Sequence, residues 1–304
     1  MKSIILLFAV FILPFKVLFA QDSDTETKKT KVEILSADDF IMEDVKGESV
    51  KQLIGNVKLK HDSTIMSCDS AYLFSNSNTL KAYGHVIIEG EGDSRLYGDS
   101  LNYNGNKRFA KVRGSVRLID SNLRMTSSML DFDRELNKAS YYTGGTIYLN
   151  EEKDTLTSRV GHYYTQQNLA KFRGNVKYKS EDFTLFADTL HYSHNKQKTV
   201  YLGPTDIYTS DSTIIYTERG WSYLKKNQSV FFQNPHIITE SRYIKADSIY
   251  YDNKTGFGEL WRKVFVSDTS ENYYVRGSYA WLNEKTEDTR VYGDSALFVQ
   301  IDSG

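Results

Sequence analysis

Residues 84–103 read GHVIIEGEGDSRLYGDSLNY and contain the two short elements that decide the fold. The first element, at residues 84–88, has the form Gly-x-Val-x-apolar, and the second, at residues 99–103, has the form Asp-Ser/Thr-apolar-x-aromatic. Apolar and polar residues alternate in both elements, as they do in a β-strand with one buried face. The stretch therefore predicts two consecutive strands, joined by the acidic, glycine-rich corner between them.

Both elements recur along the chain at intervals of 28 to 31 residues. The Gly element begins at Gly55, Gly84, Gly114 and Gly174, with weaker copies at Gly144, Gly203, Asn234, Arg262 and Gly293. The Asp element begins at Asp69, Asp99, Asp188 and Asp247, with degenerate copies that carry Ser128, Ser158, Glu218 and Gly277 in place of the aspartate. Two interleaved series with one period indicate a repeat protein in which each repeat of about 30 residues supplies two strands.

The corners between these elements are of two kinds. Acidic and serine-rich corners such as His61-Asp62-Ser63 follow the Gly element, and Asn/Lys corners such as residues 104–107 follow the Asp element. These residue types favour tight reversals because they bond their own backbone or adopt left-handed dihedral angles. The predicted fold class is all-β, an elongated repeat-built roll. By itself the pattern fits both stacked antiparallel strands and a parallel β-solenoid.

Alternation assigns one apolar face to the strands, since side chains two residues apart lie on the same side. Polar residues such as Asn56, Lys58 and Lys177 fall on the opposite face. The predicted inner face consists of Val57, Leu59, Leu73, Val86, Ile88, Leu101, Tyr103, Val116, Leu118, Leu130, Phe132, Val176, Tyr178, Leu190, Tyr192, Ile249 and Tyr251. Such a stripe is either a closed core or the lining of a groove for alkyl chains, which gain about 0.8 kcal/mol for each buried methylene.

The repeated aspartate has two interpretations. It caps backbone N–H groups where a strand enters the sheet, or it binds cations as in calcium-dependent β-rolls. Single aspartates about 30 residues apart favour capping, because those rolls gather several Asp and Gly residues in one turn. No metal site is predicted, since the closest histidine pair, His191 and His194, falls on opposite sides of a strand end. The single cysteine, Cys68, is predicted to be a small buried residue.

The N-terminus has the pattern of an export signal. Its apolar run over residues 4–13 is broken by Pro14 and Lys16, and is about half as long as a membrane-spanning helix. We predict a signal peptide over residues 1–20, cleaved after Ala20. An uncleaved membrane anchor is the alternative.

The rest of the chain divides into a leader and one domain. Residues 21–32, which begin with the polar run QDSDTETKKTK, are predicted to be a disordered leader. Residues 33–304 are predicted to form a single β-repeat domain. The sequence stops in mid-repeat after Gly293, so its last strand either receives another sheet or belongs to a longer protein.

Composition and motifs argue against several function classes. With 38 Lys+Arg against 39 Asp+Glu, the net charge is -1, which argues against a protein that tracks nucleic-acid phosphates. The sequence contains no phosphate-binding loop, no dinucleotide-binding fingerprint and no nucleophile elbow. We predict no enzymatic activity, no cofactor and no nucleic-acid partner.

The tandem Gly-x-Val and Asp-Ser/Thr-Leu-x-Tyr strands behind a signal peptide resemble the OstA/LptA-type family of periplasmic lipopolysaccharide-transport proteins, in particular the OstA-like proteins of Bacteroidetes. The resemblance covers residues 33–304 and is strongest over Gly84 to Tyr103 and Gly174 to Tyr192. It implies a β-jelly roll of stacked antiparallel strands, open along one side, whose interior holds the acyl chains of lipid A. It also implies head-to-tail stacking into a bridge between the inner and outer membranes.

This resemblance implies a scaffold in the periplasm, or associated with the outer membrane, that binds lipid along the inner face given above. Its partners would be lipopolysaccharide, other lipopolysaccharide-transport components joined by β-edge augmentation, and further copies of the chain. Two other functions fit the sequence. One is an exported structural or adhesive β-solenoid that binds no lipid, and the other is a membrane-anchored LptC-like adaptor.

Overall fold

The computed structural model describes residues 30–90, 94–121, 123–149, 152–286, 288–293 and 296–300. The predicted signal peptide and the predicted leader up to residue 29 lie outside the described residues. Thr30 to Val32 are packed against the fold, so the described part begins before residue 33, where the sequence placed the start of the domain.

The N-terminal half consists of strands that follow one another as antiparallel neighbours. Each long strand has 10 to 14 residues, which is longer than the eight to ten residues expected from the spacing of the elements. These strands are β1 (Glu33–Ser36), β2 (Asp39–Val45), β3 (Glu48–His61), β4 (Thr64–Phe74), β5 (Thr79–Glu89), β6 (Arg95–Asn104), β7 (Phe109–Ile119) and β8 (Arg124–Asp133).

The middle and the C-terminal half mix shorter strands with long ones. Two single-turn 3-10 helices, η1 (Thr165–Gln167) and η2 (Leu224–Lys226), lie at turns. The strands are β9 (Lys138–Tyr141), β10 (Gly145–Leu149), β11 (Asp154–Ser158), β12 (Val160–Tyr164), β13 (Leu169–Lys179), β14 (Phe183–Ser193), β15 (Lys198–Thr209), β16 (Ile214–Tyr223), β17 (Gln228–Phe232), β18 (His236–Ile238), β19 (Arg242–Lys245), β20 (Ser248–Asp252), β21 (Phe257–Asp268), β22 (Tyr273–Asn283), β23 (Asp288–Tyr292) and β24 (Leu297–Gln300).

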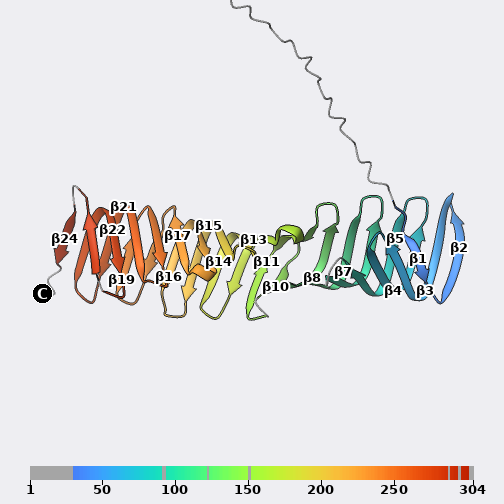
Figure 1. Cartoon of the computed structure of the whole chain (residues 1–304), viewed down its shortest axis with the longest axis horizontal. Helices are drawn as coiled ribbons and strands as arrows, with labels where there is room; N and C mark the ends of the chain where they lie inside the picture. Colours follow the sequence, from blue (N-terminus) through green and yellow to red (C-terminus); the bar gives the residue numbers. More distant parts are fainter. Residues whose placement is uncertain are drawn as a thin grey trace, which may run out of the picture.

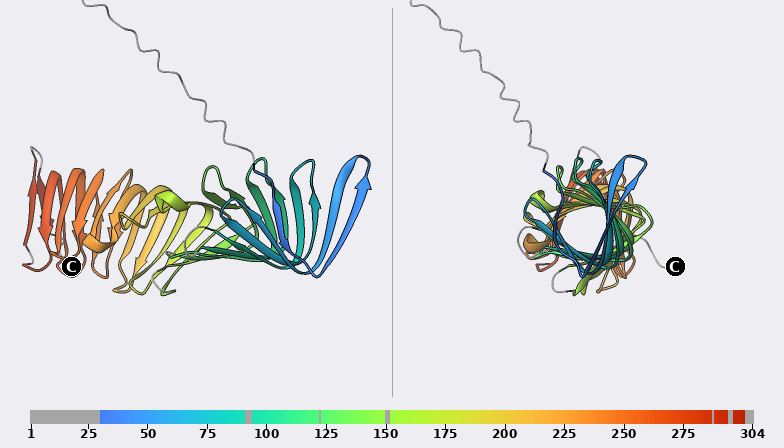
Figure 2. Two further views of the ribbon diagram at one scale, coloured as in Figure 1. Left: turned by 45° about the vertical axis from the view of Figure 1, so that its right-hand side comes forward. Right: turned by 90° about the vertical axis from the view of Figure 1, so that its right-hand side faces the viewer.

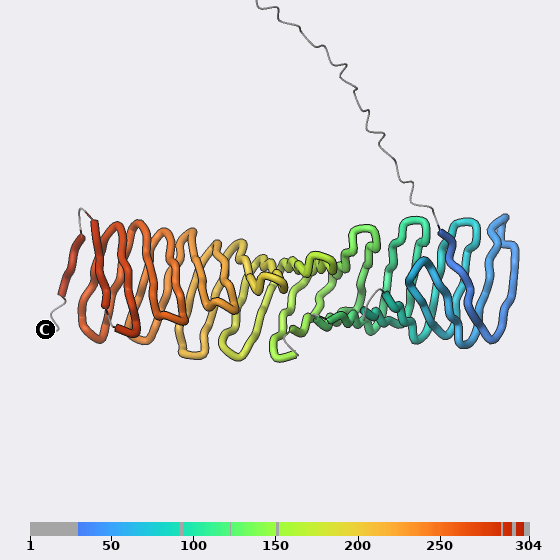
Figure 3. The backbone as a smooth tube through the Cα atoms, viewed as in Figure 1, coloured from blue at the N-terminus to red at the C-terminus, as the bar shows by residue number. Residues whose placement is uncertain are grey.

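These strands stack side by side along the long axis of the molecule, from β2 at one end to β24 at the other (Figure 1). They form one continuous sheet, and the view along the axis shows its strands wrapped around the long axis of the molecule (Figure 2). The backbone trace repeats the same loop along the whole length (Figure 3). Every strand pair in the described part of the chain is antiparallel, for example β5 with β6 and β13 with β14. The antiparallel roll is therefore confirmed, and the parallel solenoid is wrong.

A β-bulge lies at the Gly element of the long strands β3, β5, β7 and β13. The register shifts between Ile54 and Val57, and the same shift recurs at the corresponding positions of β5, β7 and β13. Such bulges insert unpaired residues and sharpen the local bend. The Gly-x part of the motif therefore makes the corner of the roll, and the Val-x-apolar part begins the second wall.

The Asp element meets this bulge from the neighbouring strand. Asp99 Oδ2 accepts a hydrogen bond from the backbone N–H of Ser115 at 3.0 Å, one residue after Gly114. In the first repeat, Asp38 Oδ2 accepts a hydrogen bond from the Asn56 side chain at 2.8 Å. Asp99 thus caps a backbone N–H group as predicted, but it does so at a bulge inside the neighbouring strand and not where a strand enters the sheet.

The weaker repeats differ in two respects. Arg159 and Ser278 stand opposite Gly174 and Gly293, each one residue later than the degenerate copies that the sequence assigned to Ser158 and Gly277. Long strands are also split around two of the weak Gly elements, with β9 and β10 separated around Gly144 and β17 and β18 separated around Asn234. Strands β15 and β21, in contrast, run without a break through the weak copies at Gly203 and Arg262.

Two rows of hairpin turns run along the roll. We call the turns after the Gly element the acidic row, which includes residues 61–63, 120–123 and 180–182, and the turns after the Asp element the amide row, which includes residues 75–78, 105–108 and 134–137. Successive turns of the amide row are hydrogen-bonded, for example Gly105 N to Asn78 O at 2.8 Å and Arg134 N to Arg108 O at 3.1 Å. The line along which the two rows meet is called the seam below.

Candidate functional site: the apolar interior and its seam

The predicted inner face lies inside the roll. Fourteen of its residues are at most 5% exposed, namely Val57, Leu59, Leu73, Val86, Leu101, Tyr103, Val116, Leu118, Leu130, Val176, Tyr178, Leu190, Tyr192 and Ile249. Ile88 and Phe132 are partly buried and pack against the same core. Tyr251 is partly buried, and its hydroxyl donates a hydrogen bond to Glu284. The assignment of the faces is confirmed for the buried positions, whereas contact of these residues with lipid stays a prediction.

Further core residues were not among the sequence candidates. Leu53, Val112 and Phe172 are fully buried in the same cluster. Each stands two residues before the glycine of its Gly element, so the same alternation continued backwards across the bulge would have found them. Together with the predicted residues they make one apolar cluster that runs from Val32 to Ala280.

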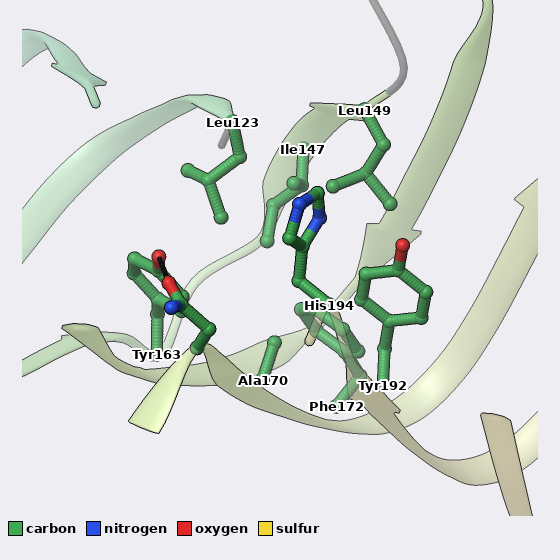
Figure 4. A pocket seen from close by; sticks show the side chains of 9 residues that line it. Leu123, Ile147, Leu149, Tyr163, Ala170, Phe172, Tyr192 and His194 are labelled. Atoms are coloured by element: carbon green, nitrogen blue, oxygen red, sulfur yellow. Dashed lines mark hydrogen bonds between the residues drawn. The ribbon is translucent and has the colours of Figure 1, made fainter. Parts of the chain in front are cut away.

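This interior is filled by the protein's own side chains. One small enclosed space lies near the middle of the roll, with about 10 Å³ of free volume, which is room for about one water molecule. Figure 4 shows its lining, with Leu123 and Tyr163 on one side and Leu149 and Tyr192 on the other. The open groove expected from the sequence is therefore closed in this conformation, and an alkyl chain could enter only if the walls or their side chains move apart.

Near the N-terminal end, a buried polar network closes the seam. His61 is 1% exposed, and its Nδ1 atom lies 2.7 Å from the Tyr103 hydroxyl. Arg134, from the amide row, donates to the same hydroxyl at 3.2 Å. Arg108 and Arg134 also lie 3.2 and 3.7 Å from Asp62 Oδ2 of the acidic row. The two rows are thus held together here by side chains that come from turns up to 73 residues apart.

The charge of Asp62 is stabilised by this network. Burial acts to raise the pKa of Asp62, but the Thr30 hydroxyl and the nearby His61, Arg108 and Arg134 outweigh burial and hold that pKa below its usual value. Ion pairs between the rows are therefore intact at neutral pH.

Buried tyrosine hydroxyls line the next part of the seam. Tyr163 donates to Asp120 Oδ2 at 3.1 Å, and this bond joins β12 to the acidic row. Within one wall, Tyr178 of β13 donates to Asp154 Oδ2 of the paired strand β11 at 2.9 Å, and burial together with this carboxylate raises the pKa of Tyr178. The seam thus consists of hydrogen bonds and ion pairs between side chains, whereas the walls are held by backbone ladders.

An acid titration should show how much Asp62 contributes to the free energy of unfolding. We expect Asp62→Asn to lower the free energy of unfolding by about 1–2 kcal/mol at pH 7, because Arg108 and Arg134 lose a charged acceptor. A carboxyl with a depressed pKa stabilises the fold above its unfolded pKa of about 3.9, and this contribution is lost as the pH falls through the lower folded value. The difference between wild type and variant, measured by denaturant unfolding from pH 7 to pH 2, should therefore shrink below about pH 4. Asp39→Asn, at an exposed position on β2, is the control and should show no such difference.

A second hollow lies on the outer corner at the C-terminal end. It encloses about 690 Å³ and is lined by Arg262, Lys263, Val264, Phe265, Arg276, Gly277, Ser278 and Gly293. Lys263 is paired with Asp247 at 3.3 Å, and the Arg276 guanidinium lies over the rings of Phe265 and Tyr274. Two of its three cations thus already have partners within the protein, and the hollow is separate from the apolar core.

Other kinds of site were sought in the part of the chain that the structure describes. It contains no cluster of three or more His, Cys, Asp or Glu side chains placed to hold a metal ion. No helix within it is long and apolar enough to cross a bilayer. Cys68 is buried as predicted, and burial raises the pKa of its thiol to about 11.

Comparison with known proteins identifies the family. Residues 29–188 match the family described as OstA-like protein, and residues 155–288 match the family described as LptA/(LptD N-terminal domain) LPS transport protein. Among solved structures, the chain is similar to LptH, the LptA homologous periplasmic component of the lipopolysaccharide transport device from Pseudomonas aeruginosa. The identity is 14% and the TM-score 0.33, over 49% of this chain and 95% of that chain. No curated relative matches the chain. Because the OstA-like family spans more than half of its length, the chain belongs to the OstA-like, LptA-type family of lipopolysaccharide-transport proteins.

Proposed function

We propose that the protein carries lipopolysaccharide through the periplasm by holding the acyl chains of lipid A between its two walls. The observation that carries this proposal is the apolar cluster, which is continuous from Val32 to Ala280 and so follows the long axis. Each methylene moved from water into such an interior gains about 0.8 kcal/mol. A core that runs without interruption lets an acyl chain move along the axis without meeting water.

The filled core accepts a lipid by opening at the seam. The contacts across the seam, such as Arg108 with Asp62 and Tyr163 with Asp120, are single bonds between side chains. They can break while the backbone ladders of both walls stay intact. Acyl chains then replace side-chain contacts in the core, and the sugars and phosphates of the lipid stay outside beside the polar rows. The protein itself has no role in supplying energy, so other components would drive the movement.

Photocrosslinking tests this proposal at single positions. A photoreactive phenylalanine analogue replaces Leu101 or Leu190, which are buried in β6 and β14, and the control position is Lys58 on the outer face of β3. We expect lipopolysaccharide to crosslink at the two inner positions at least tenfold more than at Lys58. Each variant is first checked for native unfolding behaviour. Label confined to the outer position would contradict the proposal.

We further propose that the two ends of the roll receive like domains, so that copies of the chain or other lipopolysaccharide-transport components form a bridge between the membranes. At one end, β2 exposes Phe40 by 50% and Met42 by 59%, and at the other end β24 exposes Phe298 by 60%. Among the described strands, β2 pairs only with β3 and β24 only with β22. Exposed apolar edges of this kind add strands from a partner.

The closed interior favours one alternative function. A roll whose core is already filled could serve as an exported structural or adhesive protein that binds no lipid. The same crosslinking experiment decides between the two functions, since a structural roll would give no label at Leu101 or Leu190. The membrane-anchored LptC-like adaptor depends on residues 1–20, which lie outside the described residues, and the mass of the purified chain distinguishes it.

A further inference from the structure

The N-terminal segment of residues 30–36 crosses the seam. Its strand β1 pairs with β3 through Glu33, Ile34 and Ser36, at the edge of the wall that ends in the acidic row. Before β1, the chain leaves this edge and contacts both rows of turns. In Figure 1, β1 lies in the N-terminal third of the roll, where its partner strand β3 also lies.

Thr30 and Val32 join the two rows. The Thr30 hydroxyl lies 3.0 Å from Nε2 of His61 and also donates to Asp62, both in the acidic row. On the other side, Asn78 of the amide row donates to Thr30 O at 3.0 Å and accepts from Val32 N at 2.9 Å. The Val32 side chain is 7% exposed and belongs to the apolar core. Residues 30–32 therefore close the opening between the rows and occupy part of the interior.

This closure is lightly attached. Strand β1 pairs over only four residues and its register is irregular between Ile34 and Ser36, whereas β2 pairs with β3 along its whole length. Leu35 is half exposed. The polar contacts of Thr30 and Val32 depend on a few side chains, and the Asn78 amide alone binds both Thr30 O and Val32 N. A short edge strand with few partners is the kind of element that opens first.

We propose that residues 30–36 are a displaceable strap that covers the seam of the first repeats, and that acyl chains reach the core there only after the strap has left. This inference rests on the proposed function, because it assigns a regulatory element to the same interior. The strap occupies the space between the rows with Val32 and couples them through Thr30. Its release would open the seam next to the network of His61, Tyr103 and Arg134.

A disulfide that pins the strap provides the test. Glu33 and Lys60 are paired residues of β1 and β3 and point outward, and paired residues of this kind have the Cα separation that a disulfide needs. We expect Glu33→Cys with Lys60→Cys, in a Cys68→Ser background, to load fluorescent lipid A at least tenfold more slowly when oxidised. Reduction should restore the rate. The unfolding curve of the oxidised chain checks that the variant is folded.

The matched control joins two strands that the proposal leaves together. Lys81 and Asn102 are exposed partners of β5 and β6 and neither pairs with β1, so Lys81→Cys with Asn102→Cys should load lipid equally in both redox states. If the oxidised and reduced forms of the Glu33→Cys, Lys60→Cys variant load lipid A at the same rate, the proposal that the strap must leave before loading is wrong. If lipid A loads into neither form of either variant, the proposed carrier function itself fails, which is a different result.

A second variant loosens the strap without a crosslink. Asn78 has a left-handed backbone with φ of 51°, so Asn78→Gly keeps the turn while removing the amide that binds Thr30 and Val32. We expect severalfold faster loading and faster amide exchange of residues 31–36. Asn227→Gly, at the corresponding turn far from the strap, is the control and should change neither. Unchanged loading and exchange in Asn78→Gly would count against the strap.

Discussion

Leu190→Glu is expected to lower the free energy of unfolding by about 4 kcal/mol or more, enough to unfold the roll around β14 under native conditions. Leu190 is fully buried, and its paired neighbours Phe172 and Tyr201 on β13 and β15 are buried as well. The variant loses the burial of a leucine and places a carboxyl group among apolar side chains with no cation built to receive it. Denaturant unfolding at pH 7 measures the loss.

The control for this prediction carries the same new charge on the outside. Lys179 is exposed at the end of β13, so Lys179→Glu should change the free energy of unfolding by less than about 1 kcal/mol. Because repeat proteins unfold in parts, amide exchange of β13 to β15 should be measured alongside the global transition. Equal stability of the two variants would mean that the apolar stripe faces outward.

Much of the fold was predictable because the repeat encodes it locally. Alternation around Val57 and Leu59 is enough to identify the inner face, and the glycine of each Gly element marks the place where the strand bends. In the sequence, the Gly elements and the Asp elements lie half a period apart. The sequence did not indicate that the two elements contact each other in the fold, where Asp99 of one strand caps the bulge of the next. That relation depends on strand register, which becomes known only once the pairing is antiparallel.

The closed state of the interior could not be predicted from the pattern. It depends on contacts such as His61 with Tyr103 and Arg134 with Asp62, which join residues 31 to 73 apart and occur once rather than in every repeat. Periodicity carries no information about interactions that are not periodic. For the same reason the leader was predicted to extend to residue 32, since the polar run before Val32 gives no sign that Thr30 is held by two rows of turns.

A second large effect is expected at the corner, where glycine is required for two separable reasons. Gly114 has a φ of +86°, which side-chain-bearing residues rarely adopt, and a Cβ at this position would overlap the carboxylate of Asp99. Gly114→Ala must therefore adopt a strained backbone and also displace the side chain that caps Ser115. We expect it to lower the free energy of unfolding by about 3–4 kcal/mol.

Two other corners separate these causes. Gly203 has a φ of +93° and its Cβ would lie 3.2 Å from Asp188 Cβ, whereas Gly144 has a φ of +102° and its Cβ would meet nothing within 4 Å. The backbone strain of alanine is thus similar at all three glycines, about 1–2 kcal/mol, while the steric overlap falls from Gly114 through Gly203 to Gly144. The loss of unfolding free energy should therefore be largest for Gly114→Ala, smaller for Gly203→Ala and smallest for Gly144→Ala. If Gly144→Ala proves as damaging as Gly114→Ala, the positive φ angle alone accounts for the need for glycine at these corners. The overlap with the opposite aspartate would then add nothing to the cost of the substitution. If only Gly114→Ala is severe, the Gly and Asp elements act as one structural unit at this corner, in which the glycine leaves room for the carboxylate that caps the bulge.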